Sequence, residues 1–127
     1  MSRIKSKNTV PELTIRSMLH KAGYRFRIHV KNLPGKPDIL LPKYHTVILV
    51  NGCFWHRHKR CKRATTPTTN IEYWNYKFQK NIARDKLQIK SLKKLGLKVI
   101  TVWECEISKS PEQVFKKILS RLSSTNR

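Results

Sequence analysis

The spacing of apolar residues predicts the order of helices and strands in the first part of this chain. Apolar side chains at intervals of three and four residues predict a helix that begins at Thr9, its N-cap, and ends at Gly23. Residues 24–30 alternate apolar and polar side chains, which is typical of a half-buried strand. A turn-forming loop over residues 32–37 then leads to a short apolar strand at 38–41.

The second part of the chain has longer patterns. A continuous, largely β-branched run at 46–50 is typical of a strand that is buried on both faces. A helical pattern extends over residues 70–95, a strand pattern follows at 97–103, and a last helix begins at Ser110. A long helix between two strands favours a right-handed crossover.

The element order α-β-β-β-α-β-α predicts an α/β fold in which helices flank a mixed central β-sheet. A length of 127 residues fits one domain, so residues 1–127 are expected to form a single unit. We expect the active edge of the sheet to lie near Asp38 and Asn51, where two strands meet the loops around them.

Net charge narrows the class of partner. The chain has 28 Lys and Arg against 7 Asp and Glu, a formal charge of +21. Nucleic acid is the partner that such an excess favours, because a polyanion relieves the self-repulsion. An anionic membrane surface is the alternative, but the basic residues are spread along the whole chain. No apolar run approaches the ~20 residues that span a bilayer, and no secretory signal follows Met1, so we expect a cytoplasmic protein without a membrane partner.

The cysteines and the few acidic residues are the candidate metal ligands. Cys53, Cys61 and Cys105 are an odd number, which argues against a disulfide framework and favours metal ligation or burial. Pro37-Asp38 stands at the start of a predicted strand, where a carboxylate can hold a hard divalent cation. The alternative is that Asp38 is an ordinary turn residue after the proline.

Several segments together resemble one family. They are Arg3-Ile4-Lys5-Ser6-Lys7-Asn8-Thr9 with Pro11-Glu12, Leu33-Pro34-Gly35-Lys36-Pro37-Asp38, Gly52-Cys53-Phe54-Trp55-His56, Asn81 with Arg84-Asp85, and Trp103-Glu104-Cys105. In this order they resemble the very-short-patch mismatch repair (Vsr) endonucleases, which nick the strand carrying T in a T·G mismatch produced by deamination of 5-methylcytosine. The resemblance implies a restriction-endonuclease-like fold of the Pro-Asp nuclease superfamily.

The resemblance also implies a structural zinc site. Its ligands would be Cys53, His58, Cys61 and Cys105, a set of three thiolates and one imidazole that zinc accepts in a closed tetrahedron. His56 is an alternative fourth ligand. The plainer alternative is three reduced cysteines without a metal.

For catalysis, the resemblance makes Asp38 a ligand of Mg²⁺, with the backbone carbonyl of Val50 as a plausible second ligand. His56 would be the general base, since imidazole titrates near neutrality, and Asp85 would orient it. Asp85 could instead pair with a neighbouring base on a solvated helix face. Glu12 would bind the water molecules of the magnesium ion, although a capping-box role at the helix start also explains it.

Phe54, Trp55 and Trp74 resemble the aromatic wedge with which this family enters the duplex beside the mismatch. Such rings are more often core residues in other folds. Family members often have His at the position of Asn51. Asn donates a hydrogen bond to a phosphate or leaving group but supplies no proton at neutral pH.

The resulting hypothesis is a magnesium-dependent DNA endonuclease, specific for one strand of a T·G mismatch and stabilised by zinc. Its partners would be double-stranded DNA and, functionally, a cytosine methyltransferase and mismatch-repair proteins, and we expect a monomer. Asn51, and a start close to the first helix without a DNA-embracing arm, motivate a first alternative, a catalytically weak or silent DNA-binding relative. A second alternative is a general Pro-Asp nuclease of a restriction or mobile-element system.

Overall fold

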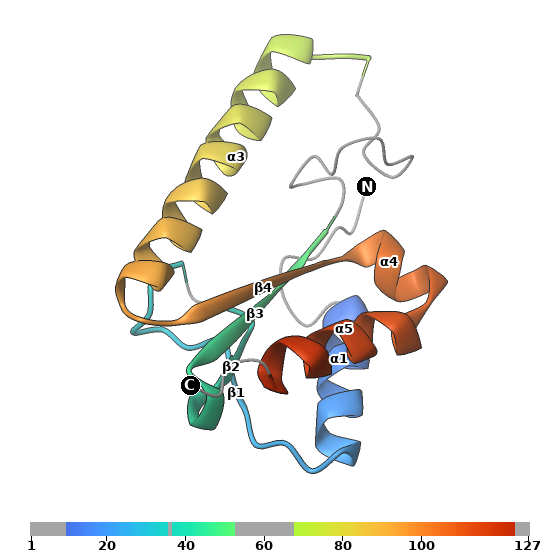
Figure 1. Cartoon of the computed structure of the whole chain (residues 1–127). Coiled ribbons are helices and arrows are strands. Elements are labelled where there is room, and N and C mark those ends of the chain that lie inside the picture. Colours follow the sequence, from blue (N-terminus) through green and yellow to red (C-terminus); the bar gives the residue numbers. More distant parts are fainter. Residues whose placement is uncertain (1–9, 36, 53–67, 124–127) are drawn as a thin grey trace.

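The structure is a computed structural model that describes residues 10–35, 37–52 and 68–123 (Figure 1). Within these ranges the helices are α1 (Val10–Lys21), α3 (Ile71–Lys94), α4 (Glu104–Lys109) and α5 (Pro111–Ser123), with a short 3-10 helix, η1, at Pro42–Tyr44. The strands are β1 (Arg27–Ile28), β2 (Ile39–Leu41), β3 (Thr46–Asn51) and β4 (Lys98–Trp103).

The strands form one mixed sheet in the order β1-β2-β3-β4. β1 pairs with β2 and β2 pairs with β3 in antiparallel register, whereas β3 and β4 are parallel. Parallel neighbours need a long crossover connection, and α3 lies within the one between β3 and β4. The predicted mixed sheet flanked by helices is therefore confirmed.

Helices cover both faces of the sheet, which gives three layers (Figure 1). On one face α1, α4 and α5 pack against the strands around a core that includes Ile15, Ile48 and Ile118. On the other face Leu92 of α3 packs with Val47 and Leu49. Successive residues of β3 thus enter opposite cores, so this strand is buried on both faces, as its continuous apolar run predicts.

α3 extends well beyond the sheet. Its 24 residues correspond to about 36 Å of helix. Ile89 and Leu92, near its carboxyl end, join the core, while Figure 1 shows the amino-terminal half rising away from the strands. The helix therefore carries its first turns out to a separate part of the molecular surface.

None of the helices in the described ranges is long and apolar enough to cross a membrane.

Two sequence expectations were wrong. The strand expected over residues 24–30 is reduced to Arg27–Ile28, because His29 has a left-handed backbone (φ 47°) that ends the extended conformation. The sequence pattern also missed α4, which begins at Glu104 directly after β4. No loop separates the strand from this helix, and its N-cap, Trp103, makes no side-chain capping bond, so the usual start signal is absent there.

Candidate active site

Asp38 lies at the start of β2, beside the end of β3. It directly follows the buried Pro37 and precedes the first residue of β2. Its Oδ2 accepts a hydrogen bond of 2.8 Å from the backbone N–H of Val50, near the end of β3. The carboxylate is therefore fixed where β2 begins and β3 ends, which is the place that the sequence analysis expected near Asp38 and Asn51.

The strand register leaves the Val50 carbonyl in an unusual position. Ile39 pairs with Ile48, so the same antiparallel register continued by two residues sets Val50 opposite Pro37. Proline has no N–H and cannot donate the ladder bond that a carbonyl would receive there. In a strand the N–H and C=O of one residue point to the same side, so the Val50 carbonyl lies on the side of Asp38. The Asp38 carboxylate and this carbonyl are oxygen groups of the kind that Mg²⁺ prefers as ligands.

Glu12 is the second acid of the site. It lies in the first turn of α1 and is 1% exposed. Its Oε2 is 3.2 Å from Nη1 of Arg16, one turn later on the same helix, and 2.7 Å from Nε2 of His29. Burial of a carboxylate costs several kcal/mol unless it is paired and hydrogen-bonded, and these two contacts offset that cost.

Glu12, His29 and Asp38 form one cluster. One potential ligand atom from each lies within 4.8 Å of the other two, which is a spacing that suits a bound cation. Sequence reasoning singled out Glu12 and Asp38 but missed His29. A histidine nine residues before Asp38 is a weak signal, because only the β1–β2 pairing brings it back beside the acids.

Other residues that the sequence singled out lie farther along the same elements. Asn51 ends β3, and Asp85 is half-buried on α3. Trp74, in the first turn of α3, is half-buried, with its ring centroid 5.7 Å from that of Phe78 and 5.3 Å from that of Tyr73. Cys105 is half-buried on α4. Cys53, Phe54, Trp55, His56, His58 and Cys61 lie outside the described residues, as does the expected N-cap, Thr9.

Comparison with known proteins identifies the family. A family profile described as DNA mismatch endonuclease Vsr matches residues 1–63. The type II nicking enzyme V.XorIIP of Xanthomonas oryzae pv. oryzae is 46% identical over 108 residues, which cover 85% of this chain and 79% of the relative. The type II nicking enzyme V.NmeAIP of Neisseria meningitidis serogroup A is 42% identical over 96% of this chain and 85% of its own. The chain belongs to the Vsr family.

Another Vsr relative is the DNA mismatch endonuclease Vsr of Escherichia coli K12, which is 39% identical over 84% of this chain and 68% of its own. Family membership makes this protein a DNA endonuclease, a hydrolase, and implies the restriction-endonuclease-like fold expected from the sequence. The observed α/β architecture with a mixed four-stranded sheet agrees with that fold.

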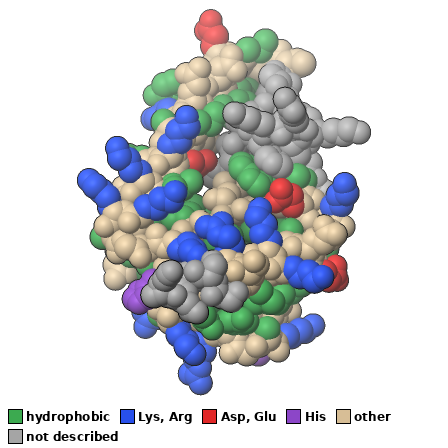
Figure 2. Space-filling view, in the orientation of Figure 1, with side chains coloured by type: hydrophobic (Ala, Val, Ile, Leu, Met, Phe, Trp, Pro, Cys, Tyr) green, Lys and Arg blue, Asp and Glu red, His purple; other side chains and the backbone are tan. Residues whose placement is uncertain are grey.

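The surface of this Vsr-family chain suits a polyanion. Figure 2 shows Lys and Arg side chains along α3 and over the middle of the same face, with few acids among them. The exposed basic residues of α3 are Lys77, Lys80, Arg84, Lys86, Lys90, Lys93 and Lys94. Long cationic side chains along one helix are opposite in charge to the phosphates of nucleic acid and can pair with them.

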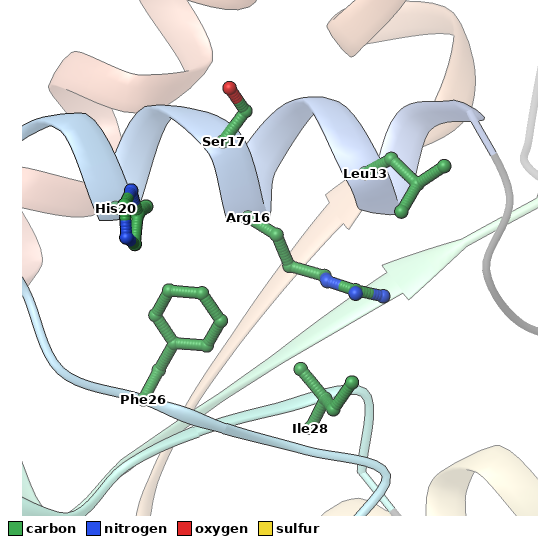
Figure 3. A pocket seen from close by; sticks show the side chains of 6 residues that line it. All are labelled: Leu13, Arg16, Ser17, His20, Phe26 and Ile28. Atoms are coloured by element: carbon green, nitrogen blue, oxygen red, sulfur yellow. The ribbon is translucent and has the colours of Figure 1, made fainter.

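A separate groove beside the acid cluster is mostly apolar. It is lined by Leu13, Arg16, Ser17, His20, Phe26 and Ile28, and Figure 3 shows Arg16 extending from α1 toward the side of Ile28. None of the candidate acids lines this groove. We therefore centre the candidate active site on the acids and not on the groove.

The loop before Asp38 is held by α3. Gly35 has φ of 71°, and a Cβ built on it would lie 2.4 Å from two side-chain atoms of Gln88. Gln88 also donates a hydrogen bond of 3.3 Å from Nε2 to the carbonyl of Pro34. The Vsr segment that ends in Asp38 thus depends on a glycine for both its backbone conformation and its close contact with α3.

Gly35→Ala is therefore expected to lower the free energy of unfolding by about 1–2 kcal/mol from left-handed strain, and by about 1 kcal/mol more when the displaced Gln88 side chain loses its hydrogen bond to Pro34. Gly23→Ala is the matched control, because Gly23 has φ of 87° and nothing within 4 Å of its Cβ position. The control should lose only the strain, about 1–2 kcal/mol. Urea unfolding measures both, and equal losses would contradict a clamp on this loop.

Proposed function

We propose that this chain is a cytoplasmic, monomeric DNA repair enzyme that nicks the T-containing strand at T·G mismatches left by deamination of 5-methylcytosine. The observation that supports it most directly is the position of the Asp38 carboxylate. It accepts a hydrogen bond from the Val50 N–H, and one of its oxygens lies within 4.8 Å of a carboxylate oxygen of the buried Glu12. Such oxygen ligands at a sheet edge fit a metal-dependent phosphodiesterase. The mismatch substrate is supported by the family's name and by the E. coli relative.

In this proposal Asp38 and the Val50 carbonyl would hold Mg²⁺, and Glu12 would accept hydrogen bonds from water molecules around the ion. When bound, the ion lowers the pKa of an attacking water and neutralises charge that develops on the scissile phosphate. The Val50 N–H keeps one oxygen of Asp38 in place, which fixes the direction of the other. The buried Glu12 carboxylate is in contact with the side chains of Arg16 and His29.

His56 is the proposed general base. It would take a proton from the attacking water, and Asp85 would orient its imidazole from α3. Asn51, at the end of β3, would donate a hydrogen bond from its side-chain amide to a phosphate oxygen. Because the Asn51 amide cannot release a proton, the oxygen that leaves the phosphorus atom would take its proton from solvent.

Recognition of the mismatch is assigned to aromatic side chains. Phe54, Trp55 and Trp74 would enter the stack beside the T·G pair, where opening costs less than at a matched pair. Trp74 stands near the start of α3, which rises from the sheet with Tyr73 and Tyr76 exposed beside it. The exposed bases farther along α3 would follow the DNA backbone.

A structural zinc ion is proposed on Cys53, His58, Cys61 and Cys105. Asn51 pairs with Trp103 in the parallel β3–β4 register. In the sequence, Cys53 and Cys105 each follow one of these paired residues by two positions. One ion bound by both segments would tie the end of β3 to the start of α4.

A second candidate function follows from the relatives named type II nicking enzymes. In that case the chain would nick DNA in connection with a restriction system, without the dependence on a T·G mismatch. A functional link to a cytosine methyltransferase would exist under either proposal, and a link to mismatch-repair proteins under the first.

Single-turnover nicking with Mg²⁺ distinguishes these functions. We expect the T-containing strand of a T·G duplex to be nicked faster than the same strand in a T·A duplex by one to two decades, since stacking by one aromatic side chain is worth about 1–3 kcal/mol. Asp38→Asn should lower the T·G rate by about three decades, because the metal supplies several kcal/mol. Its control is Glu112→Gln, an exposed acid at the start of α5.

Equal rates on T·G and T·A duplexes would favour the general nicking enzyme. An unchanged rate in Asp38→Asn, with the Glu112→Gln control also unchanged, would remove Asp38 from the metal site. No nicking by the unaltered protein, with DNA binding intact, would favour a silent DNA-binding relative.

The zinc proposal predicts one zinc ion per purified chain, measured by elemental analysis. Cys105→Ser should lose that ion and unfold at a lower temperature, because binding free energy of a structural zinc is also folding free energy. Ser108→Ala, an exposed change on the same helix, should keep both properties of the unaltered protein. Absence of stoichiometric zinc from the unaltered protein would contradict the site.

A further inference from the structure

His29 contacts both acids of the candidate site through different atoms. Its backbone N–H donates a hydrogen bond of 3.1 Å to the carbonyl of Asp38. Its ring Nε2 lies 2.7 Å from Oε2 of Glu12. One residue thereby connects α1 to the start of β2.

The backbone of His29 has an unfavourable conformation. Its φ of 47° is left-handed, which costs a residue with a Cβ about 1–2 kcal/mol. Such a conformation persists when surrounding contacts determine it. The two hydrogen bonds of His29 are contacts of that kind, and both lead to the acids.

Arg16 cannot replace this contact. It approaches Glu12 from one turn later on α1, so their ion pair stays within a single helix and makes no link between Glu12 and the sheet. The His29 ring comes from the segment between β1 and β2. Of the two contacts, the imidazole is the one that links Glu12 to the segment leading into Asp38 and β2.

We propose that His29 is a positioning residue of the cation site. Its ring holds the Glu12 carboxylate beside Asp38, so that both acids face one divalent cation without rearrangement. This inference rests on the proposed metal-dependent function. Partners that orient the groups around a bound metal typically contribute 10- to 100-fold to metal affinity.

The test is binding of Mn²⁺ to the full chain without DNA, followed by electron paramagnetic resonance. Mn²⁺ accepts the same carboxylate and carbonyl oxygens as Mg²⁺. His29→Gly removes the ring and also relieves the left-handed backbone, so the variant is expected to fold. We expect its Mn²⁺ affinity to fall 10- to 100-fold.

His45→Gly is the matched control. His45 is exposed, has nearly the same φ, 49°, and lies in the turn before β3, where its N–H donates to the Pro42 carbonyl. Its replacement should leave Mn²⁺ affinity unchanged. In nicking assays His29→Gly should raise the Mg²⁺ concentration needed for half-maximal rate, with kcat largely recovered at saturating Mg²⁺.

Each outcome bears on a different claim. If the unaltered protein binds no Mn²⁺, the proposed cation site itself is wrong. If it binds Mn²⁺ and His29→Gly binds equally well, the positioning role is wrong and the proposed function stands. Unfolding of His29→Gly but not of His45→Gly, seen by circular dichroism, would also overturn the proposal, because His29 would then serve the fold alone.

Discussion

The antiparallel register between β2 and β3 determines where the groups of the candidate site lie. Continued by two residues, this register sets Pro37 opposite Val50, and proline has no N–H to donate to the ladder there. The Asp38 carboxylate takes the Val50 N–H in place of a backbone acceptor. A shift of one residue would turn every side chain of β2 to the opposite face and remove this arrangement.

The buried acid cluster contrasts with the charge of the whole protein. A chain of formal charge +21 attracts DNA over long distances, yet a uniformly basic surface offers nothing to hold a divalent cation. Glu12 supplies a carboxylate at a place where it is 1% exposed and in contact with Arg16 and His29. The structure thus separates the basic helix α3, suited to the phosphate backbone, from a small acidic centre suited to a metal.

Much of the fold could be predicted from local patterns. The run at 46–50 is buried on both faces because it lies between two helical layers, and Gly23 and Gly96 follow α1 and α3 with positive φ. The short length of β1 could not be predicted, because the left-handed His29 is set by contacts with residues distant in sequence. α4 was missed for a related reason, since a helix that follows a strand directly shows no turn signal.

Two of the three residues in the acid cluster were singled out from the sequence, and the third was not. The place of Asp38 after Pro37 at a strand start made it a candidate, the resemblance to the Vsr family gave it a magnesium role, and Glu12 was noted for a capping role and a magnesium role. The capping partner, Thr9, lies outside the described residues, while the contacts of Glu12 to Arg16 and His29 give it a structural reason that no local pattern contains. His29 required the β1–β2 pairing, which a single sequence does not specify.

Asp38 and the Val50 carbonyl are proposed to form one cation site, and anomalous diffraction from crystals soaked in Mn²⁺ can locate the ion. We expect one strong peak about 2.2 Å from both a carboxylate oxygen of Asp38 and the carbonyl oxygen of Val50, with Glu12 in the surrounding shell. A well-occupied manganese peak elsewhere, with this edge of the sheet empty, would contradict it.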